Sequence, residues 1–162
     1  MKKEINEKVL YEPIKKWLQK YLEDHYRNSE VVVINSHSQR LDKVLLQNNI
    51  KCDVAVGIDI QIDVLGIVKK ADKYKLFFVE AKATRLTLRD LGQLWAYVKL
   101  INPEEAFLIT SENFGSLDKI LKVFKREDML DFGDGKKIKK IQVLLWDLKT
   151  NLPDLSSKIP KI

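Results

Sequence analysis

Three polar side chains interrupt two stretches of otherwise apolar, strand-forming residues. Asp63 lies in the alternating stretch 58–64, and Glu80 and Lys82 lie in the apolar stretch 76–83. Because successive side chains of a strand point to opposite faces, Glu80 and Lys82 share one face. If the two strands pair as a hairpin, Asp63 comes close to Glu80. Polar residues at positions that otherwise suit a core are where chemistry is expected.

Two carboxylates and an ammonium group in one place have a chemical use. The carboxylates repel each other unless a cation lies between them. A few hard oxygen ligands, with water completing the shell, suit Mg²⁺ or Mn²⁺. Such a metal polarises a phosphoryl oxygen and lowers the pKa of a bound water, and a nearby lysine can orient that water or neutralise developing charge. The pattern predicts a hydrolytic site for a phosphodiester; the alternative is a surface ion pair between Glu80 and Lys82.

Hydrophobic patterning predicts the elements that must position these residues. They are, in chain order, helix 3–26 interrupted by Pro13, strand 31–34, a helical turn at 41–46, strand 58–68, a turn at 69–73, strand 75–83, helix 88–101 opened by a capping box of Thr87 and Asp90, strand 106–110, helix 117–124, a turn at 133–135 and strand 141–148. Such an order favours an α/β fold with a central mixed β-sheet flanked by helices. We expect residues 1–150 to form a single domain and residues 151–162 a C-terminal tail.

Three motifs, taken in their order and spacing, resemble the PD-(D/E)XK nuclease superfamily. They are Ile62-Asp63-Val64-Leu65-Gly66, Val79-Glu80-Ala81-Lys82 and Gln93-Leu94-Trp95-Ala96-Tyr97. The resemblance covers residues 7–110 and implies a restriction-endonuclease-like fold. It also implies that Asp63, Glu80 and the Ala81 carbonyl bind the metal and that Lys82 is the catalytic lysine. One departure is that an isoleucine stands where the family's motif has a proline before the aspartate.

The helix expected after the second motif carries two further candidates. Gln93 and Tyr97 are four residues apart and therefore share one helical face. By the resemblance, Gln93 reaches toward the metal site or a substrate phosphate, with Tyr97 beside it. The alternative is a pair on the helix surface that makes local hydrogen bonds.

Many members of this superfamily add a glutamate from the first helix to the site. Here Glu4, Glu7 and Glu12 compete for that place. At about 100° per residue, Glu7 lies on the face of the apolar stripe, whereas Glu12 points away from it. A carboxylate on a core-facing stripe is the unusual one, so Glu7 is our candidate, although a kink at Pro13 would rotate the assignment.

Two groups of acidic and polar residues offer alternatives around the metal site. Asp53 is a rival for the metal aspartate, but it lies farther from Glu80 along the chain than Asp63 does. Asp59 and Gln61 share the expected face of Asp63, where they either line the same groove or face solvent.

The charge balance favours a polyanionic partner without identifying one. There are 29 Lys and Arg against 23 Asp and Glu, so the formal net charge is +6. Surplus positive charge attracts polyanions, although lysine also keeps proteins in solution. The candidate nucleic-acid contacts are Arg85, Arg89, Tyr97, Lys136 and Lys137. The alternative is that these side chains contact only water.

Composition argues against several other classes of protein. The lone Cys52 and the two histidines, His25 and His37, leave no Cys-rich or His-rich metal cage. No apolar run is long enough to cross a membrane, and the polar N-terminus does not suit a signal peptide. No GxGxxG or P-loop pattern occurs. We expect a cytoplasmic location.

The combined prediction is a Mg²⁺-dependent (or Mn²⁺-dependent) DNA endonuclease that hydrolyses phosphodiester bonds, on branched or damaged DNA. A small chain without a separate recognition domain suggests a homodimer that cuts two strands. The alternative is a catalytically silent nucleic-acid-binding domain with a nuclease fold. A partner-binding domain whose carboxylates are merely solvated is a third hypothesis.

Overall fold

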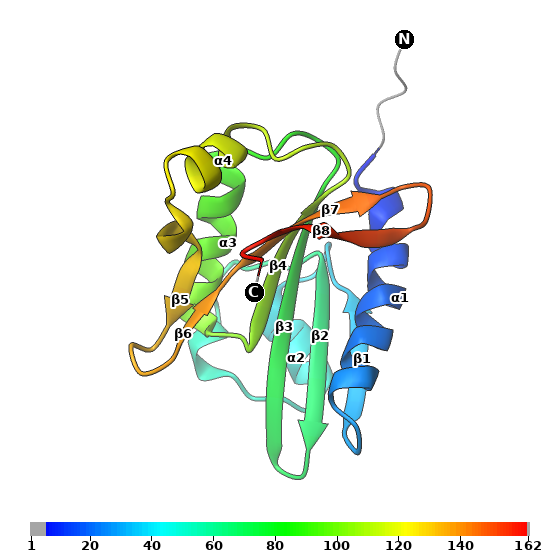
Figure 1. The fold of residues 1–162 in the computed structure, drawn as a ribbon. Coiled ribbons are helices and arrows are strands. Elements are labelled where there is room, and N and C mark those ends of the chain that lie inside the picture. Colours follow the sequence, from blue (N-terminus) through cyan, green and yellow to red (C-terminus); the bar gives the residue numbers. More distant parts are fainter. Residues whose placement is uncertain (1–5, 162) are drawn as a thin grey trace.

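The computed structural model describes residues 6–161, and its centre is a six-stranded mixed sheet with helices on both faces (Figure 1). The helices and strands are α1 (Lys8–His25), β1 (Glu30–Asn35), α2 (Leu41–Gln47), β2 (Val64–Lys70), β3 (Lys73–Lys82), α3 (Leu88–Ile101), β4 (Glu105–Thr110), α4 (Ser116–Asp118), β5 (Asp131–Gly133), β6 (Ile138–Lys140), β7 (Gln142–Asp147) and β8 (Leu152–Ile159). Among residues 6–161, no helix has both the length and the apolar character that crossing a membrane requires.

The sheet combines an antiparallel half with a parallel centre. Its strand order is β1-β2-β3-β4-β7-β8. The β1, β2 and β3 strands pair antiparallel, β3, β4 and β7 pair parallel, and β8 returns antiparallel to β7. Helix α3 connects the parallel neighbours β3 and β4, as parallel pairing requires. The predicted α/β class with a central mixed sheet flanked by helices is confirmed.

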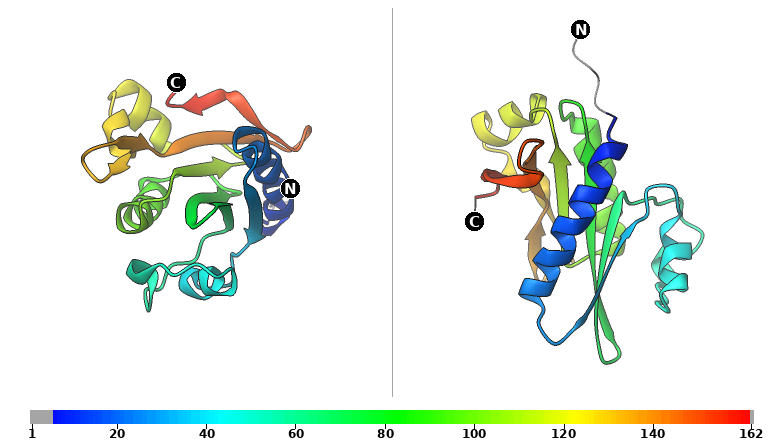
Figure 2. Two further views of the ribbon diagram at one scale, coloured as in Figure 1. Left: turned by 90° about the horizontal axis from the view of Figure 1, so that it is seen from below. Right: turned by 90° about the vertical axis from the view of Figure 1, so that its right-hand side faces the viewer.

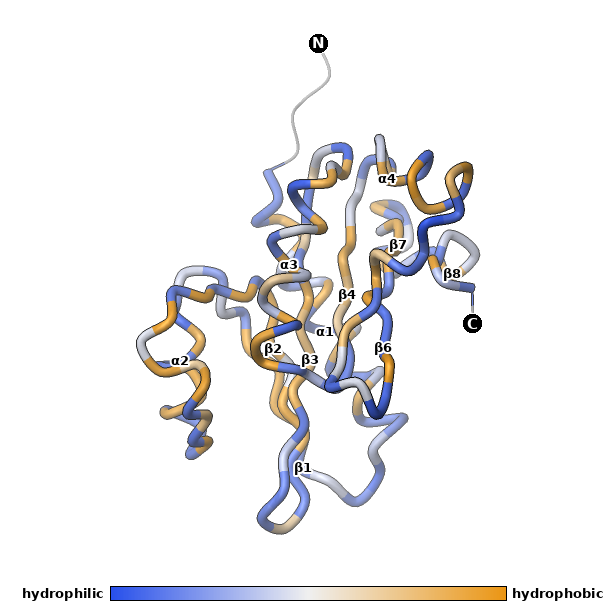
Figure 3. The backbone as a smooth tube through the Cα atoms, turned by 90° about the vertical axis from the view of Figure 1, so that its left-hand side faces the viewer, coloured by the Kyte–Doolittle hydropathy of each residue, from blue (hydrophilic) through white to orange (hydrophobic). Residues whose placement is uncertain are grey.

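The two faces of the sheet belong to two separate hydrophobic clusters. Helix α1 packs its apolar stripe, which includes Leu18 and Leu22, against Val64 and Phe77 on one face. Helices α2 and α3 cover the other face, where Phe78 is buried. Figure 2 shows α1 on its own side of the twisted sheet, and Figure 3 shows that the central strands are mostly hydrophobic. Successive residues of β2 and β3 therefore pack into opposite hydrophobic clusters, one on each face of the sheet.

Gly66 is where α1 approaches the sheet most closely. A Cβ atom at this position would lie 2.8 Å from Leu22 Cδ1 and 3.1 Å from Phe77 Cβ. We expect Gly66→Ala to lower the free energy of unfolding by about 1–3 kcal/mol, because the added methyl overpacks a filled interface. Urea denaturation measures this change. Gly92→Ala on α3 is the matched control, since its Cβ would meet nothing within 4 Å; an equal loss there would contradict the packing argument.

Two predictions from the sequence pattern are confirmed: the hairpin of β2 and β3, and helix α3. Strands β2 and β3 pair Lys70 with Lys73, which leaves a two-residue turn inside the predicted range 69–73. Helix α3 spans the predicted residues, and its capping box of Thr87 and Asp90 is formed. Helix α1 continues through Pro13 and ends one residue before the predicted end. The expected start at residue 3, like Glu4, lies outside the described residues.

The strand predicted from residue 58 begins only at Val64. Strand β1 ends opposite Val64, so residues 58–63 have no partner strand on that side. Their carbonyls bind other groups: Ile60 accepts from the Leu41 N–H at 2.7 Å, and Asp63 accepts from the Ser36 N–H at 3.0 Å. The alternation that suggested a strand is seen in the burial of Ile60 and Ile62 but not at Ile58, which is exposed, and these residues form no hydrogen-bonded ladder with a neighbouring strand.

The predicted C-terminal tail is wrong, because most of it forms β8. This strand pairs antiparallel with β7 at the edge of the sheet. Ser157 supports the irregular part of the pairing, since its Oγ accepts a hydrogen bond from the Leu145 N–H at 2.9 Å. An edge strand exposes much of its surface, so it needs little of the apolar alternation that reveals a central strand. The helix predicted at 117–124 is a single α-helical turn followed by a π-helical turn at Lys119–Val123.

Candidate functional site

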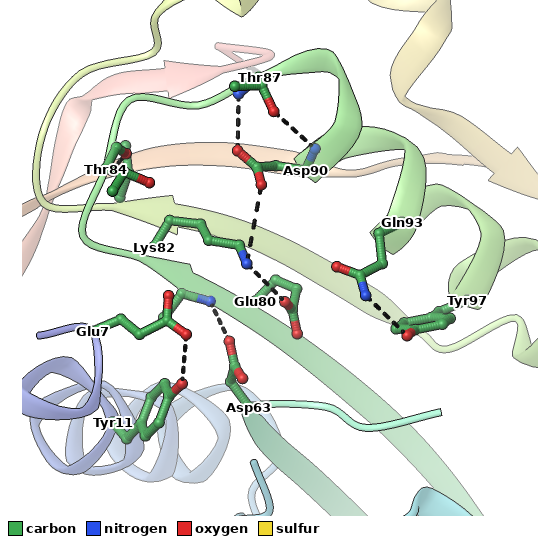
Figure 4. A network of polar contacts seen from close by, with 12 residues as sticks. Glu7, Tyr11, Asp63, Glu80, Lys82, Thr84, Thr87, Asp90, Gln93 and Tyr97 are labelled. Atoms are coloured by element: carbon green, nitrogen blue, oxygen red, sulfur yellow. Dashed lines mark hydrogen bonds and ion pairs between the residues drawn. The ribbon is translucent and has the colours of Figure 1, made fainter. Parts of the chain in front are cut away.

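The register of the β2–β3 hairpin brings the two predicted metal-binding carboxylates together. Val64 pairs with Val79, so Asp63 lies just before the ladder, beside Glu80 and Ala81. Asp63 Oδ2 accepts a hydrogen bond from the Ala81 N–H at 2.8 Å. A side-chain oxygen thereby satisfies a strand amide that the β2 backbone no longer reaches. Figure 4 shows the two carboxyl groups side by side at this end of β3.

Burial makes negative charge costly at this pair. Glu80 is only 5 % exposed. Desolvation, followed by the negative charge of Asp63, raises the pKa of Glu80 to about 8, and the Lys82 ammonium only partly opposes this. Burial also raises the pKa of Asp63, against the effect of the Ala81 N–H. A bound cation would remove this penalty, since it favours the ionised form of both groups.

Lys82 lies between two acidic side chains at the end of β3. Its Nζ is 4.0 Å from Glu80 Oε2 and 4.0 Å from Asp90 Oδ1 at the start of α3. The side chain is about one-fifth exposed, so part of it contacts solvent. The strand alternation correctly placed Lys82 with Glu80, while its contact with Asp90 was not predicted.

Of the candidate N-terminal glutamates, Glu7 reaches this site and Glu12 does not. The Tyr11 hydroxyl donates a hydrogen bond to Glu7 Oε1 at 3.1 Å. The charge of Glu7 is one cause of the raised pKa of Asp63, so the two carboxylates are close. Glu12 instead accepts a hydrogen bond from Asn35 Nδ2 at 3.5 Å. Of the two candidate glutamates that the structure describes, the one predicted from the amphipathic pattern is therefore the one that lies at this site, and its catalytic role stays a prediction.

Tyr11 and His37 belong to the site although the sequence analysis gave neither a role. Tyr11 is buried and stacks on His37, with 4.7 Å between the ring centroids. Asn35 Oδ1 lies 2.7 Å from His37 Nδ1 and holds the ring. The spacing of Glu7 and Tyr11, one helical turn apart, could have indicated Tyr11. Nothing in the local pattern points to His37, because it reaches the site from the loop after β1.

A pocket of about 430 Å³ joins these residues. All five predicted catalytic residues line it, together with Tyr97 and both of the polar residues that share a face with Asp63. The predicted residues in its wall are Glu7, Asp59, Gln61, Asp63, Glu80, Lys82, Gln93 and Tyr97, and the additional ones are Lys8, Tyr11 and His37. Gln93 Nε2 donates to the Tyr97 hydroxyl at 3.2 Å, so the local hydrogen bond of the alternative interpretation is formed in the pocket wall.

Several other candidates lie outside this pocket. Asp53 occupies a short 3₁₀ turn and does not line it. Arg85 and Arg89 are exposed near the start of α3 but are also not in its wall. Lys137 lies 3.6 Å from Glu104.

Glu104 lies at the end of the sheet that is opposite the pocket. Its N–H binds the Leu76 carbonyl, and Leu76 lies six positions before Lys82 on β3. At about 3.3 Å per residue, this separation is about 20 Å. Lys136 and Lys137, on the hairpin between β5 and β6, are therefore remote from the carboxylates.

The donor set fits a magnesium-type ion held by few protein ligands. Within the described chain, no group of three or more His, Cys, Asp or Glu side chains is placed to hold a metal ion. What remains is a pair of carboxylates, the half-buried Asp63 and the buried Glu80. Mg²⁺ is commonly bound through one or two carboxylates, with water and substrate phosphates as its other ligands. The chemistry of this pair agrees with that mode.

Fold and site together define an α/β protein with a carboxylate pair and a lysine at the end of a central strand. No protein-family model, curated protein or solved structure matches the chain. Function must therefore be inferred from the chemistry of the pocket.

Proposed function

We propose that this protein is a Mg²⁺-dependent or Mn²⁺-dependent deoxyribonuclease of the PD-(D/E)XK type with a restriction-endonuclease-like fold. The observation that carries the proposal is the juxtaposition of Asp63 and Glu80, with Lys82 beside them, in one pocket. Burial and the charge of Asp63 raise the pKa of Glu80, and a bound cation would offset the cost of ionising both carboxylates. The Gln93 side chain in the same pocket completes the predicted set.

Asp63, Glu80 and the Ala81 carbonyl would hold the metal. A bound Mg²⁺ supplies Lewis acidity toward a phosphoryl oxygen and lowers the pKa of a bound water. Lys82 would then place positive charge beside the developing negative charge of the phosphate. Glu7, close to Asp63, would orient the attacking water by accepting a hydrogen bond, and Gln93 would donate to a phosphate oxygen.

DNA is the proposed substrate, cleaved internally at branched or damaged positions by a cytoplasmic homodimer. The net charge of +6 supports a polyanionic substrate. Arg85 and Arg89, exposed on the segment between β3 and the first turn of α3, would contact backbone phosphates near the pocket. Such contacts are independent of base sequence and weaken with salt.

The test is cleavage of supercoiled plasmid, linear duplex, single-stranded and four-way-junction DNA with Mg²⁺, Mn²⁺ or EDTA. We expect metal-dependent cleavage that Asp63→Asn reduces by about 100-fold or more, because the change removes a charged metal ligand. Asparagine retains an oxygen that accepts from the Ala81 N–H, so the strand pairing is preserved. Asp72→Asn, an exposed change in the β2–β3 turn, is the control and should have wild-type activity.

Equal cleavage by wild type and Asp63→Asn would mean that the site is misplaced or that a contaminating nuclease is present. No cleavage by any variant, with DNA binding intact, would instead support the silent nucleic-acid-binding domain.

A further inference from the structure

The carboxylate of Asp90 has two partners, one for each oxygen. Oδ2 accepts a hydrogen bond from the Thr87 N–H at 2.9 Å, while Thr87 Oγ1 accepts from the Asp90 N–H at 3.2 Å. Oδ1 faces the neighbouring strand, 4.0 Å from Lys82 Nζ. Figure 4 shows this chain of contacts from Thr87 through Asp90 to Lys82. Capping of the helix requires only the hydrogen bonds with Thr87 and does not require the contact between Asp90 Oδ1 and Lys82.

Helix α3 fixes the position of the Asp90 carboxylate. Leu91 and Leu94 of its first turns are buried in the core cluster, so the helix cannot shift without repacking. The reciprocal hydrogen bonds with Thr87 also restrict the rotamer of Asp90. A negative charge near a helix N-terminus is further stabilised by the helix dipole. Asp90 is therefore a rigid anchor, whereas a lysine side chain has four flexible bonds.

Among the residues that the structure describes, the other ion-pair partner of Lys82 is Glu80, at the same distance, and Lys82 also lies close enough to Asp63 to lower the pKa of that carboxyl group. In the proposed function, Glu80 binds the metal, and its negative charge is then shared with a divalent cation. The attraction between Glu80 and the Lys82 ammonium weakens accordingly. Asp90 is then the carboxylate that still favours the position of the ammonium group beside the pocket.

We propose that Asp90 is a positioning residue that holds the Lys82 ammonium at the pocket and so links the N-terminus of α3 to the catalytic strand. The role rests on the proposed nuclease function, and Asp90 acts through Lys82 without contacting the substrate. This inference explains why the capping acid of α3 is only 18 % exposed and faces β3.

Two substitutions separate positioning from capping. Asp90→Asn keeps an oxygen that accepts from the Thr87 N–H but removes the charge that faces Lys82. Thr87→Ala removes the Oγ1 half of the capping box and leaves the Asp90 charge in place. We expect Asp90→Asn to lower kcat for DNA cleavage by about 10- to 100-fold at unchanged KM, and Thr87→Ala to change kcat by less than about 2-fold.

A second measurement does not depend on cleavage. The order of the Lys82 side chain is measured by ¹³C relaxation at its Cε atom, with and without Mg²⁺. We expect a lower order parameter in Asp90→Asn than in wild type and Thr87→Ala, with the larger difference when Mg²⁺ is present.

Unchanged Lys82 order in Asp90→Asn, or an equal loss of kcat in Thr87→Ala, would overturn the proposed role. If the wild-type protein does not cleave DNA, the nuclease proposal fails. The relaxation comparison still decides whether Asp90 holds Lys82.

Discussion

Replacement of Lys82 by alanine is expected to reduce DNA cleavage by about 10²- to 10⁴-fold, because one positioned charged or proton-transferring group contributes that much to a chemical step. The Lys82 side chain lines the pocket, is about one-fifth exposed and has its ammonium group beside Glu80 and Asp90. Gel-based cleavage at saturating DNA measures kcat, and calorimetry measures Mg²⁺ binding.

Binding should respond differently from cleavage. Without Lys82, the carboxylates of Asp63 and Glu80 lose a compensating positive charge, since Lys82 opposes the rise in pKa of both groups. Their need for a cation therefore grows, and Mg²⁺ should bind at least as tightly as it does to the wild type. DNA affinity should change little, because one phosphate contact is a small part of a polyelectrolyte interface.

Lys75→Ala is the matched control for this experiment. Lys75 lies on the same strand as Lys82, but it pairs with Glu104 at 3.8 Å, at the other end of β3 from the pocket. Both substitutions remove one positive charge, so a general effect of net charge on DNA binding would be equal in the two variants. A comparable loss of cleavage in Lys75→Ala, or full activity of Lys82→Ala, would contradict the assigned role.

The proximity of Asp63 and Glu80 was predictable because a hairpin fixes its own register. Once the turn was placed correctly, pairing distributed each later residue to a definite partner and face. The prediction held even though residues 58–63 are not a strand. It depended only on the chain direction into Val64, and the Asp63 side chain itself extends the pairing by accepting from Ala81.

The parts of the site that were missed come from contacts between elements that are distant in sequence. His37 reaches Tyr11 from the loop after β1, and Asp90 reaches Lys82 from α3. Asp90 was correctly predicted as a capping residue, but a local pattern reports only the local partner of a side chain. Which strand lies beside a helix N-terminus depends on tertiary packing. The same limit applies to β8, which becomes a strand because the exposed edge of β7 needs a partner.

Glu80→Gln is expected to stabilise the metal-free protein at alkaline pH while it abolishes cleavage. Burial and the charge of Asp63 raise the pKa of Glu80 from its ordinary value of 4.5 to about 8. The folded protein therefore retains a proton that the unfolded chain releases above pH 4.5. The stabilisation from this proton is fully present below about pH 4.5 and is lost as the pH rises through about 8. Above that range the folded state carries a buried charge.

Glutamine has nearly the same shape and no charge to bury. In EDTA at pH 8–9, we expect the free energy of unfolding of Glu80→Gln to exceed that of the wild type by about 1–3 kcal/mol. The two proteins should converge near pH 4.5, where Glu80 is protonated when folded. Urea denaturation across this pH range measures the difference. Glu112→Gln, at an exposed glutamate after β4, is the control and should change stability little at any pH.

Mg²⁺ should reduce the difference in the free energy of unfolding between the two proteins, because it binds the wild-type carboxylates and stabilises the folded wild type by mass action. It should have little effect on Glu80→Gln, in which one charged ligand is lost. A variant that is more stable without metal, and inactive with it, would indicate that Glu80 is retained for its chemistry at a cost in stability. If Glu80→Gln is instead less stable than the wild type at pH 8–9 in EDTA, its carboxylate is a structural ion-pair partner of Lys82. The case for a metal site at Asp63 and Glu80 would then lose its main electrostatic support.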